Sequence, residues 1–178
     1  MDIFAHALWT NIVYFKKYKA EVRNRFIAVA FGVVPDLMSF VPFFVYTFLG
    51  GKEFWQVMGS GAWVARYASE SYNYTHSIVI FSLIFIVVGL FRKFWNRSFV
   101  YWPIFGWLLH ILIDIPSHKD FYETPFLFPL SGYKFSHGVS WGHPIFMITN
   151  YGALAAIYLV WFLVFRKKNL PEKPEKRG

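Results

Sequence analysis

The sequence contains no cysteine, so it can form no disulfide bond and offers no thiolate to a metal ion. Charged residues are also scarce, at 16% against about 25% in a typical soluble domain, while 56% of the residues are hydrophobic and 23% are aromatic. This composition disfavours a soluble globular domain. Any metal ion must be held by histidine and carboxylate, which favours zinc, manganese or iron over an iron–sulfur cluster.

The net charge of +8 is concentrated in three short segments of the 178-residue chain. Fourteen of the eighteen lysines and arginines lie in residues 16–25, 92–97 and 166–178, each beside an apolar run. Basic residues beside membrane spans mark the cytoplasmic side, so the pattern predicts membrane topology and argues against a nucleic-acid surface. We expect one membrane-embedded domain over residues 1–165, followed by a basic, disordered cytoplasmic tail over 166–178.

Four apolar runs predict an all-α, polytopic membrane protein with four to five membrane-embedded helices. The runs are residues 26–49, 76–91, 99–115 and 144–165. The last is long enough to cross a bilayer without a charge, whereas the second is marginal unless residues 72–75 extend it. Loops 50–75 and 116–143 carry only two basic residues each, so we expect them outside and the basic segments inside.

Pro35-Asp36 interrupts the first run, because proline disfavours helical geometry in the residue before it and removes a backbone donor. We therefore expect a helix over residues 3–19 to run inward and a second over 24–35 to run back outward. Residues 37–49 would then lie within or along the outer interface. A straight span over the whole run, with a cytoplasmic N-terminus, would instead place His6 on the opposite side from the other polar groups.

His110 and Asp114 lie four residues apart in a strongly hydrophobic stretch, so their side chains share one helix face. Ionisable groups at membrane depth are costly unless they pair or bind something. His118 would continue the stripe, but Pro116 indicates that it approaches from a different angle. Three more donors lie in comparably apolar surroundings, namely His6, Asp36 and His76. Together these six residues predict a site for one or two divalent ions, most simply zinc, near the outer surface.

Each candidate also fits a structural role. Asp36 could cap a helix starting at Leu37, and Thr75 could cap the span that opens near His76. His6 could be a satisfied core histidine, and His76 a wet interfacial one. The pair at 110 and 114 could simply bond to each other across one helical turn. The occurrence of five such groups in so apolar a chain favours the metal site.

The motifs resemble those of the LexA-regulated inner-membrane family of metal-dependent hydrolases. The resemblance covers roughly residues 1–130 and rests on these segments: His6, Val34-Pro35-Asp36, Tyr74-Thr75-His76-Ser77, the stretch from Gly106 to His110 and Asp114, and Thr124-Pro125 with Pro129-Leu130. It implies a helical membrane protein with a divalent-metal hydrolytic site.

The order of the ligands is also similar to that in zinc-dependent phospholipase C and the single-strand nucleases that share its helical fold. That similarity implies that Asp36, His76, His110 and Asp114 hold one zinc ion and that Asp114 bridges to a second ion near His6. Whether His137 or His143 joins His118 in a further position stays open, since solvent exposure is the default for both in their Gly- and Ser-containing loop.

The function expected from these residues is hydrolysis of a lipid ester or phosphodiester, most simply in a phospholipid, at the outer membrane interface. Asp36 is the candidate to orient the attacking water, and His118 is a second catalytic candidate. A small metal or proton transporter could use the same residues as a pathway. A structural or partner-binding membrane subunit is a third possibility, and it predicts no bound metal.

Overall fold

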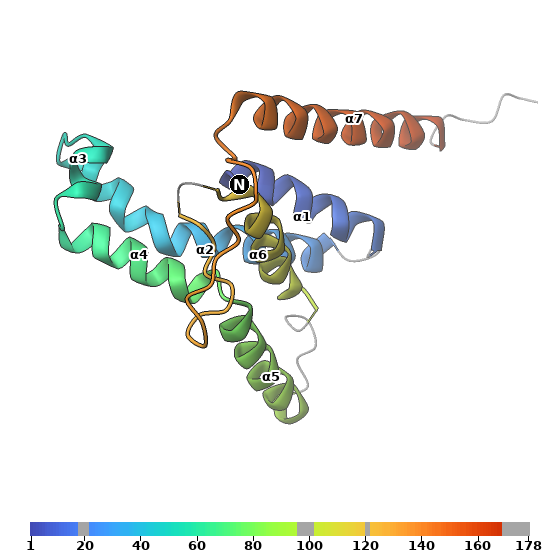
Figure 1. The fold of residues 1–178 in the computed structure, drawn as a ribbon. Coiled ribbons are helices and arrows are strands. Elements are labelled where there is room, and N and C mark those ends of the chain that lie inside the picture. The colour runs from blue at the N-terminus through green and yellow to red at the C-terminus, as the bar shows by residue number, and fades with distance from the viewer. Residues whose placement is uncertain (18–21, 96–101, 120–121, 169–178) are drawn as a thin grey trace, which may run out of the picture.

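The structure is a computed structural model that describes residues 1–17, 22–95, 102–119 and 122–168, and every regular element within these ranges is a helix. The helices are α1 (Ile3–Lys17), α2 (Val22–Leu49), α3 (Phe54–Gly59), α4 (Trp63–Thr75), α5 (Ile78–Trp95), α6 (Phe105–Ser117) and α7 (Pro144–Lys168) (Figure 1). The predicted all-α class is confirmed. Helix α7 continues to Lys168, which is within the expected tail over 166–178, and residues 169–178 lie outside the described ranges.

Helix α2 is the element around which α1, α4 and α6 pack (Figure 1). The prediction that Pro35-Asp36 divides this region is wrong, because α2 stays helical for 28 residues through Pro35 and Pro42. Phe43 in its second half packs against Val64 and other residues of α3 and α4. Burial of this helix outweighs the backbone hydrogen bond that each proline removes. Asp36 therefore lies inside a helix and does not cap one.

A close helix contact brings α6 onto the first half of α2. A Cβ atom at Gly106 would lie 2.1 Å from the carbonyl oxygen of Ala28, so only glycine allows this approach. Small residues at a crossing let two backbones come together, which is common between helices in membranes. The contact places the polar face of α6 beside the middle of α2.

Helices α4 and α5 form a corner and not one straight span. The chain bends by 61° between them, so residues 72–75 extend the second apolar run only if the bent pair forms one broken span. Ser77 starts α5: its Oγ accepts hydrogen bonds from the backbone N–H groups of Val79 (3.1 Å) and Ile80 (3.2 Å). This is N-cap geometry, so Ser77, and not Thr75, is the cap. His76 lies at the corner itself.

Helix α7 lies alongside α1 and is joined to it by polar side chains as well as by apolar contacts. Trp9 Nε1 donates to Asn150 Oδ1 (2.8 Å), and Asn11 Nδ2 donates to Tyr158 OH (2.6 Å). Hydrogen bonds of this kind are a typical means of joining helices in an apolar environment. They hold the start of α1, which carries His6, in a defined position.

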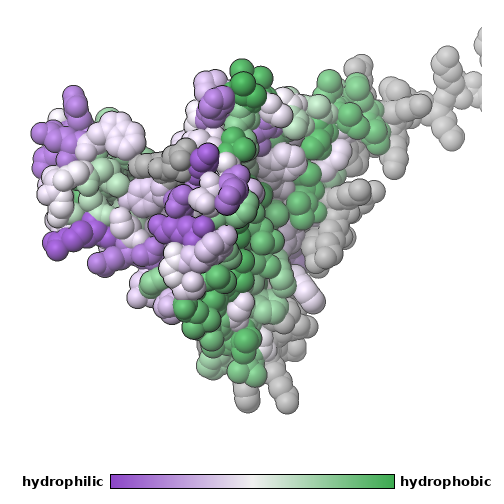
Figure 2. Space-filling model, viewed as in Figure 1, coloured by the Kyte–Doolittle hydropathy of each residue, from purple (hydrophilic) through white to green (hydrophobic). Residues whose placement is uncertain are grey.

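Two helices are long and apolar enough to cross a membrane, over Arg23–Leu49 and Pro144–Val164. The number rises to three if the bent pair Trp63–Thr75 and Ile78–Phe91 forms one span, while α1 and α6 are apolar but shorter. The four to five membrane-embedded helices expected from the sequence are thus confirmed only in part. In Figure 2, hydrophobic residues gather over α5 and α7, whereas hydrophilic residues gather over α3 and α4.

Candidate metal centre

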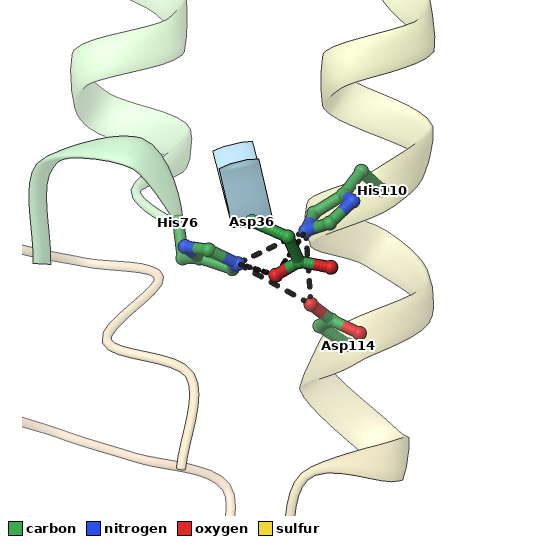
Figure 3. A group of neighbouring side chains, drawn as sticks. All are labelled: Asp36, His76, His110 and Asp114. Carbon is green, nitrogen blue, oxygen red and sulfur yellow. Dashed lines mark hydrogen bonds and ion pairs between the residues drawn. The ribbon is translucent and has the colours of Figure 1, made fainter. Parts of the chain in front are cut away.

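Four of the predicted ligands, Asp36, His76, His110 and Asp114, converge on one point (Figure 3). Asp36 comes from the middle of α2, His76 from the corner between α4 and α5, and the other two from one face of α6. The side chain of Asp36 is 10% exposed and the other three are fully buried. Three separate elements therefore bring two carboxylates and two imidazoles into the interior.

The distances among the donor atoms suit a single small cation. His110 Nε2 lies 2.9 Å from His76 Nε2 and 3.1 Å from Asp114 Oδ2. His76 Nε2 lies 3.4 Å from Asp36 Oδ1 and 3.5 Å from Asp114 Oδ2, and His110 Nε2 lies 3.7 Å from Asp36 Oδ1. A tetrahedron of ligands at zinc bond lengths of about 2.0–2.1 Å has edges of about 3.3–3.4 Å. The five separations are distributed around that value.

Hydrogen bonds to the other ring nitrogens show which way the imidazoles face. His110 Nδ1 lies 2.8 Å from the carbonyl oxygen of Gly32, and His76 Nδ1 lies 3.2 Å from that of Tyr72 and 2.9 Å from Thr75 Oγ1. A ring nitrogen that faces a carbonyl carries the hydrogen, so both Nε2 atoms present lone pairs. Two lone pairs 2.9 Å apart repel each other unless a cation or a proton lies between them.

The second oxygen of Asp114 belongs to a neighbouring group of donors. Its Oδ1 lies 2.9 Å from His6 Nε2 and 3.3 Å from His118 Nε2, and the amino group of Met1 also contacts it. The Met1 nitrogen lies 2.5 Å from His118 Nε2. A positively charged group therefore already lies among these donors. Asp114 is placed to bridge two positions, one on each side of its carboxylate.

His6 is held differently from the other histidines. Its ring stacks on that of His110, with centroids 3.8 Å apart and planes at 25°. It is 1% exposed; its Nε2 lies 2.9 Å from Asp114 Oδ1, and its Nδ1 makes no hydrogen bond within the described part of the chain. Unlike His76 and His110, it therefore has no second partner that fixes its ring, while its Nε2 is placed beside the carboxylate as a ligand would be.

His118 is positioned by the segment that follows α6. The helix ends at Ser117, and the backbone N–H of His118 still donates to the carbonyl of Asp114 (3.0 Å). Its Nδ1 lies 3.2 Å from the carbonyl oxygen of Tyr122, a residue with a φ of 51°. The backbone N–H groups of Val139 (2.7 Å) and Trp141 (2.8 Å) donate to carbonyls just before His118. A distant loop therefore pins the end of α6.

All six predicted ligands meet at this centre, whereas His137 and His143 are exposed in the loop before α7 and do not reach it. Sequence reasoning missed the supporting groups, above all Tyr72 and the carbonyl of Gly32. Tyr72 had a detectable signal, because it lies four residues before His76 and so shares its helix face. No sequence signal could have identified the carbonyl of Gly32, because 78 residues separate it from His110 in the chain.

The electrostatics of the centre also favour a cation. Two carboxylates lie among imidazoles that are neutral when they act as ligands, and within the described ranges neither carboxylate pairs with a lysine or arginine side chain. Asp114 has the Met1 amino group as a charged partner, whereas only histidines lie beside Asp36, and a buried carboxylate without a compensating charge costs several kcal/mol or more. Outside the helices, burial raises the pKa of the Tyr122 phenol, so its hydroxyl stays protonated at neutral pH.

Comparison of the chain with family models, curated proteins and solved structures gave no match.

Proposed function

We propose that the chain is a membrane-bound, metal-dependent hydrolase with an all-nitrogen-and-oxygen centre that suits zinc. The observation that carries the proposal is the orientation of the ligands: two imidazoles are fixed at Nδ1 by backbone carbonyls and turn Nε2 toward two buried carboxylates. This second layer of hydrogen bonds is typical of metal-ligating histidine. A purely structural His–Asp pair requires neither the second histidine nor the second carboxylate.

Asp36, His76, His110 and Asp114 would hold one ion. His6, His118 and Oδ1 of Asp114 would hold a second in place of the Met1 amino group, which contacts Oδ1 and His118 Nε2 in this structure. A bound zinc ion lowers the pKa of its water and stabilises negative charge that develops on a carbonyl or phosphoryl oxygen. Asp36 has the longest single separation of the five, 3.7 Å to His110 Nε2, and the only side chain of the four with any exposure, at 10%. It is therefore the residue we assign to orient an attacking water and accept its proton. His118 is the second catalytic candidate.

The position of the centre in the fold supports a lipid substrate. At 1.5 Å per residue, Asp36 lies about 16–17 Å along α2 from Arg25, the last residue of the first basic segment. If that segment marks the cytoplasmic face, the centre lies just beyond the middle of a hydrocarbon core about 30 Å thick, at a depth that lipid chains occupy. In this arrangement α1, α2, α5, α6 and α7 are embedded in the inner membrane. We propose a lipid ester or phosphodiester, most simply a phospholipid, as the substrate.

The test uses the full chain purified in detergent and reconstituted into liposomes of mixed phospholipids. Metal content is measured by mass spectrometry after dialysis, and released headgroups and fatty acids are measured before and after zinc is removed and restored. We expect one or two equivalents of zinc and lipid turnover that follows the metal. Zinc flux across the liposomes without lipid turnover would favour the transporter, and a chain that binds no metal would favour a structural subunit.

A further inference from the structure

Tyr72 connects the two sides of the centre, although no part of it faces an ion position. It lies on α4, one turn before His76, and is 2% exposed. Its ring stacks on that of His76, with centroids 3.7 Å apart and planes at 22°. Its hydroxyl lies 3.2 Å from His118 Nδ1. One side chain therefore contacts a ligand of each proposed ion.

The hydrogen bonds around the Tyr72 hydroxyl fix the role of His118. The hydroxyl donates to the carbonyl oxygen of Tyr122 (2.8 Å), so its own oxygen is left to accept a hydrogen bond. His118 Nδ1 has this oxygen and the Tyr122 carbonyl at the same distance of 3.2 Å. Both neighbours are acceptors toward Nδ1, so the hydrogen resides there and Nε2 presents its lone pair to Asp114 Oδ1 and the Met1 amino group, where the second ion is proposed to bind.

We propose that Tyr72 is a positioning residue with two roles. Its hydroxyl orients His118 and so sets the affinity for the second ion, and its ring supports His76, a ligand of the first ion. The inference rests on the proposed metal centre and adds a residue that couples the two ion positions. Tyr72 touches neither ion nor substrate. Its hydroxyl and its ring act on different ligands, so substitutions that remove one or both have different expected effects.

The experiment titrates zinc into metal-free protein in detergent and follows the stoichiometry and affinity of each equivalent. Tyr72→Phe keeps the ring on His76 and removes the hydroxyl, so the affinity for the second equivalent should fall about 10–100-fold while the first is unchanged. Tyr72→Leu removes the ring as well, so the first equivalent should also weaken. Tyr122→Phe is the matched control: it removes a phenol hydroxyl but keeps the carbonyl that Tyr72 and His118 use.

A double substitution separates positioning from general support of the fold. If the Tyr72 hydroxyl acts through His118, adding Tyr72→Phe to His118→Gln should cost no further zinc affinity. Additive losses, or a Tyr72→Phe protein that titrates like the wild type, would overturn the proposal. Wild-type protein that binds no zinc would instead refute the metal centre itself, and the Tyr72 inference with it.

A second measurement covers the case in which Tyr72→Phe does not fold. Incorporation of 3-fluorotyrosine at position 72 preserves the side chain, and its fluorine resonance should move when the second zinc equivalent binds. In a His118→Gln background the same addition should leave the resonance in place. If the fluorine resonance does not move when the second zinc equivalent binds to the protein with His118 intact, the proposal is overturned.

Discussion

The two oxygens of Asp114 face two differently built environments. On the Oδ2 side, His76 and His110 are anchored at Nδ1 by the carbonyls of Tyr72 and Gly32, both within helices. On the Oδ1 side, His6 has no such anchor, and His118 is anchored on Tyr122, which lies in a loop. Both sides bury their imidazoles, so the difference lies in support and not in solvent access.

This difference indicates how tightly each side should bind. A ligand that is already oriented loses little freedom when the ion arrives, whereas an unsupported ligand must be ordered at that moment. We therefore expect the Oδ2 side to take the first and tighter ion. The Oδ1 side should bind a weaker, more easily removed ion, and substitutions should reveal the asymmetry.

The largest effect is expected for Asp114→Asn, because this residue alone serves both sides. The change keeps the shape of the side chain and removes the charge, so both ions should be lost together with hydrolysis. We expect a decrease in zinc affinity of at least about 100-fold, beyond that typical of supporting residues. Glu70→Gln, a matched neutralisation of an exposed carboxylate on α4, should leave zinc content and turnover unchanged. If Asp114→Asn kept one tightly bound zinc ion, Asp114 would not bridge the two ion positions.

The second prediction concerns Asp36, the least buried member of the Oδ2 side. Asp36→Asn should lower turnover more than zinc content, because a group that orients water and takes its proton contributes about 10²–10⁴-fold to the rate. The measurement is the initial rate of lipid hydrolysis divided by the zinc bound to the same preparation. Equal losses of zinc and turnover would make Asp36 a ligand only.

The six ligands could be predicted because they stand out from their neighbours. Each lies in an apolar segment where an unpaired polar group is costly, and the spacing of His110 and Asp114 places both on one helix face whatever the rest of the fold does. His118 has the same spacing from Asp114, and α6 continues through Pro116 to Ser117, so the backbone N–H of His118 still donates to the carbonyl of Asp114.

The course of the backbone around these residues was not predictable in the same way. The continuity of α2 through Pro35 depends on packing against α1, α4 and α6, and local propensity contains no information about that packing. The corner at His76 depends on Ser77, which caps α5 and also bonds to the carbonyl of Phe128 from a distant loop. Such contacts exist only once the fold has formed.

The third prediction tests the unsupported side directly. His6→Gln keeps a polar side chain of similar reach but removes the imidazole, so it should weaken the second zinc equivalent about 10–100-fold and leave the first in place. His110→Gln is the comparison on the other side and should abolish the tight equivalent. If His6→Gln weakened the first equivalent as much as the second, the two sides would not be separable. Zinc titration of both variants decides between these outcomes.

The smallest effect is expected at Gly138, which lies against the backbone of Pro116 near the end of α6. A Cβ atom there would lie 2.3 Å from the carbonyl oxygen of Pro116, the acceptor for Val139 N–H, so Gly138→Ala must push the loop away from the end of α6. Overpacking of this kind costs about 1–3 kcal/mol. We expect a lower unfolding midpoint, and a loss of less than about tenfold in affinity for the second zinc equivalent alone, because the loop supports His118 and not the Oδ2 side.

Gly142→Ala is the matched control for the loop, since a Cβ atom at that position meets nothing within 4 Å. It should leave both zinc equivalents and the unfolding midpoint unchanged. A Gly138→Ala protein with a lower midpoint but wild-type titration would show that the loop stabilises the fold without orienting His118. If Gly138→Ala also lost the first zinc equivalent, the loop would affect the Oδ2 side as well. The two sides would then not bind zinc independently.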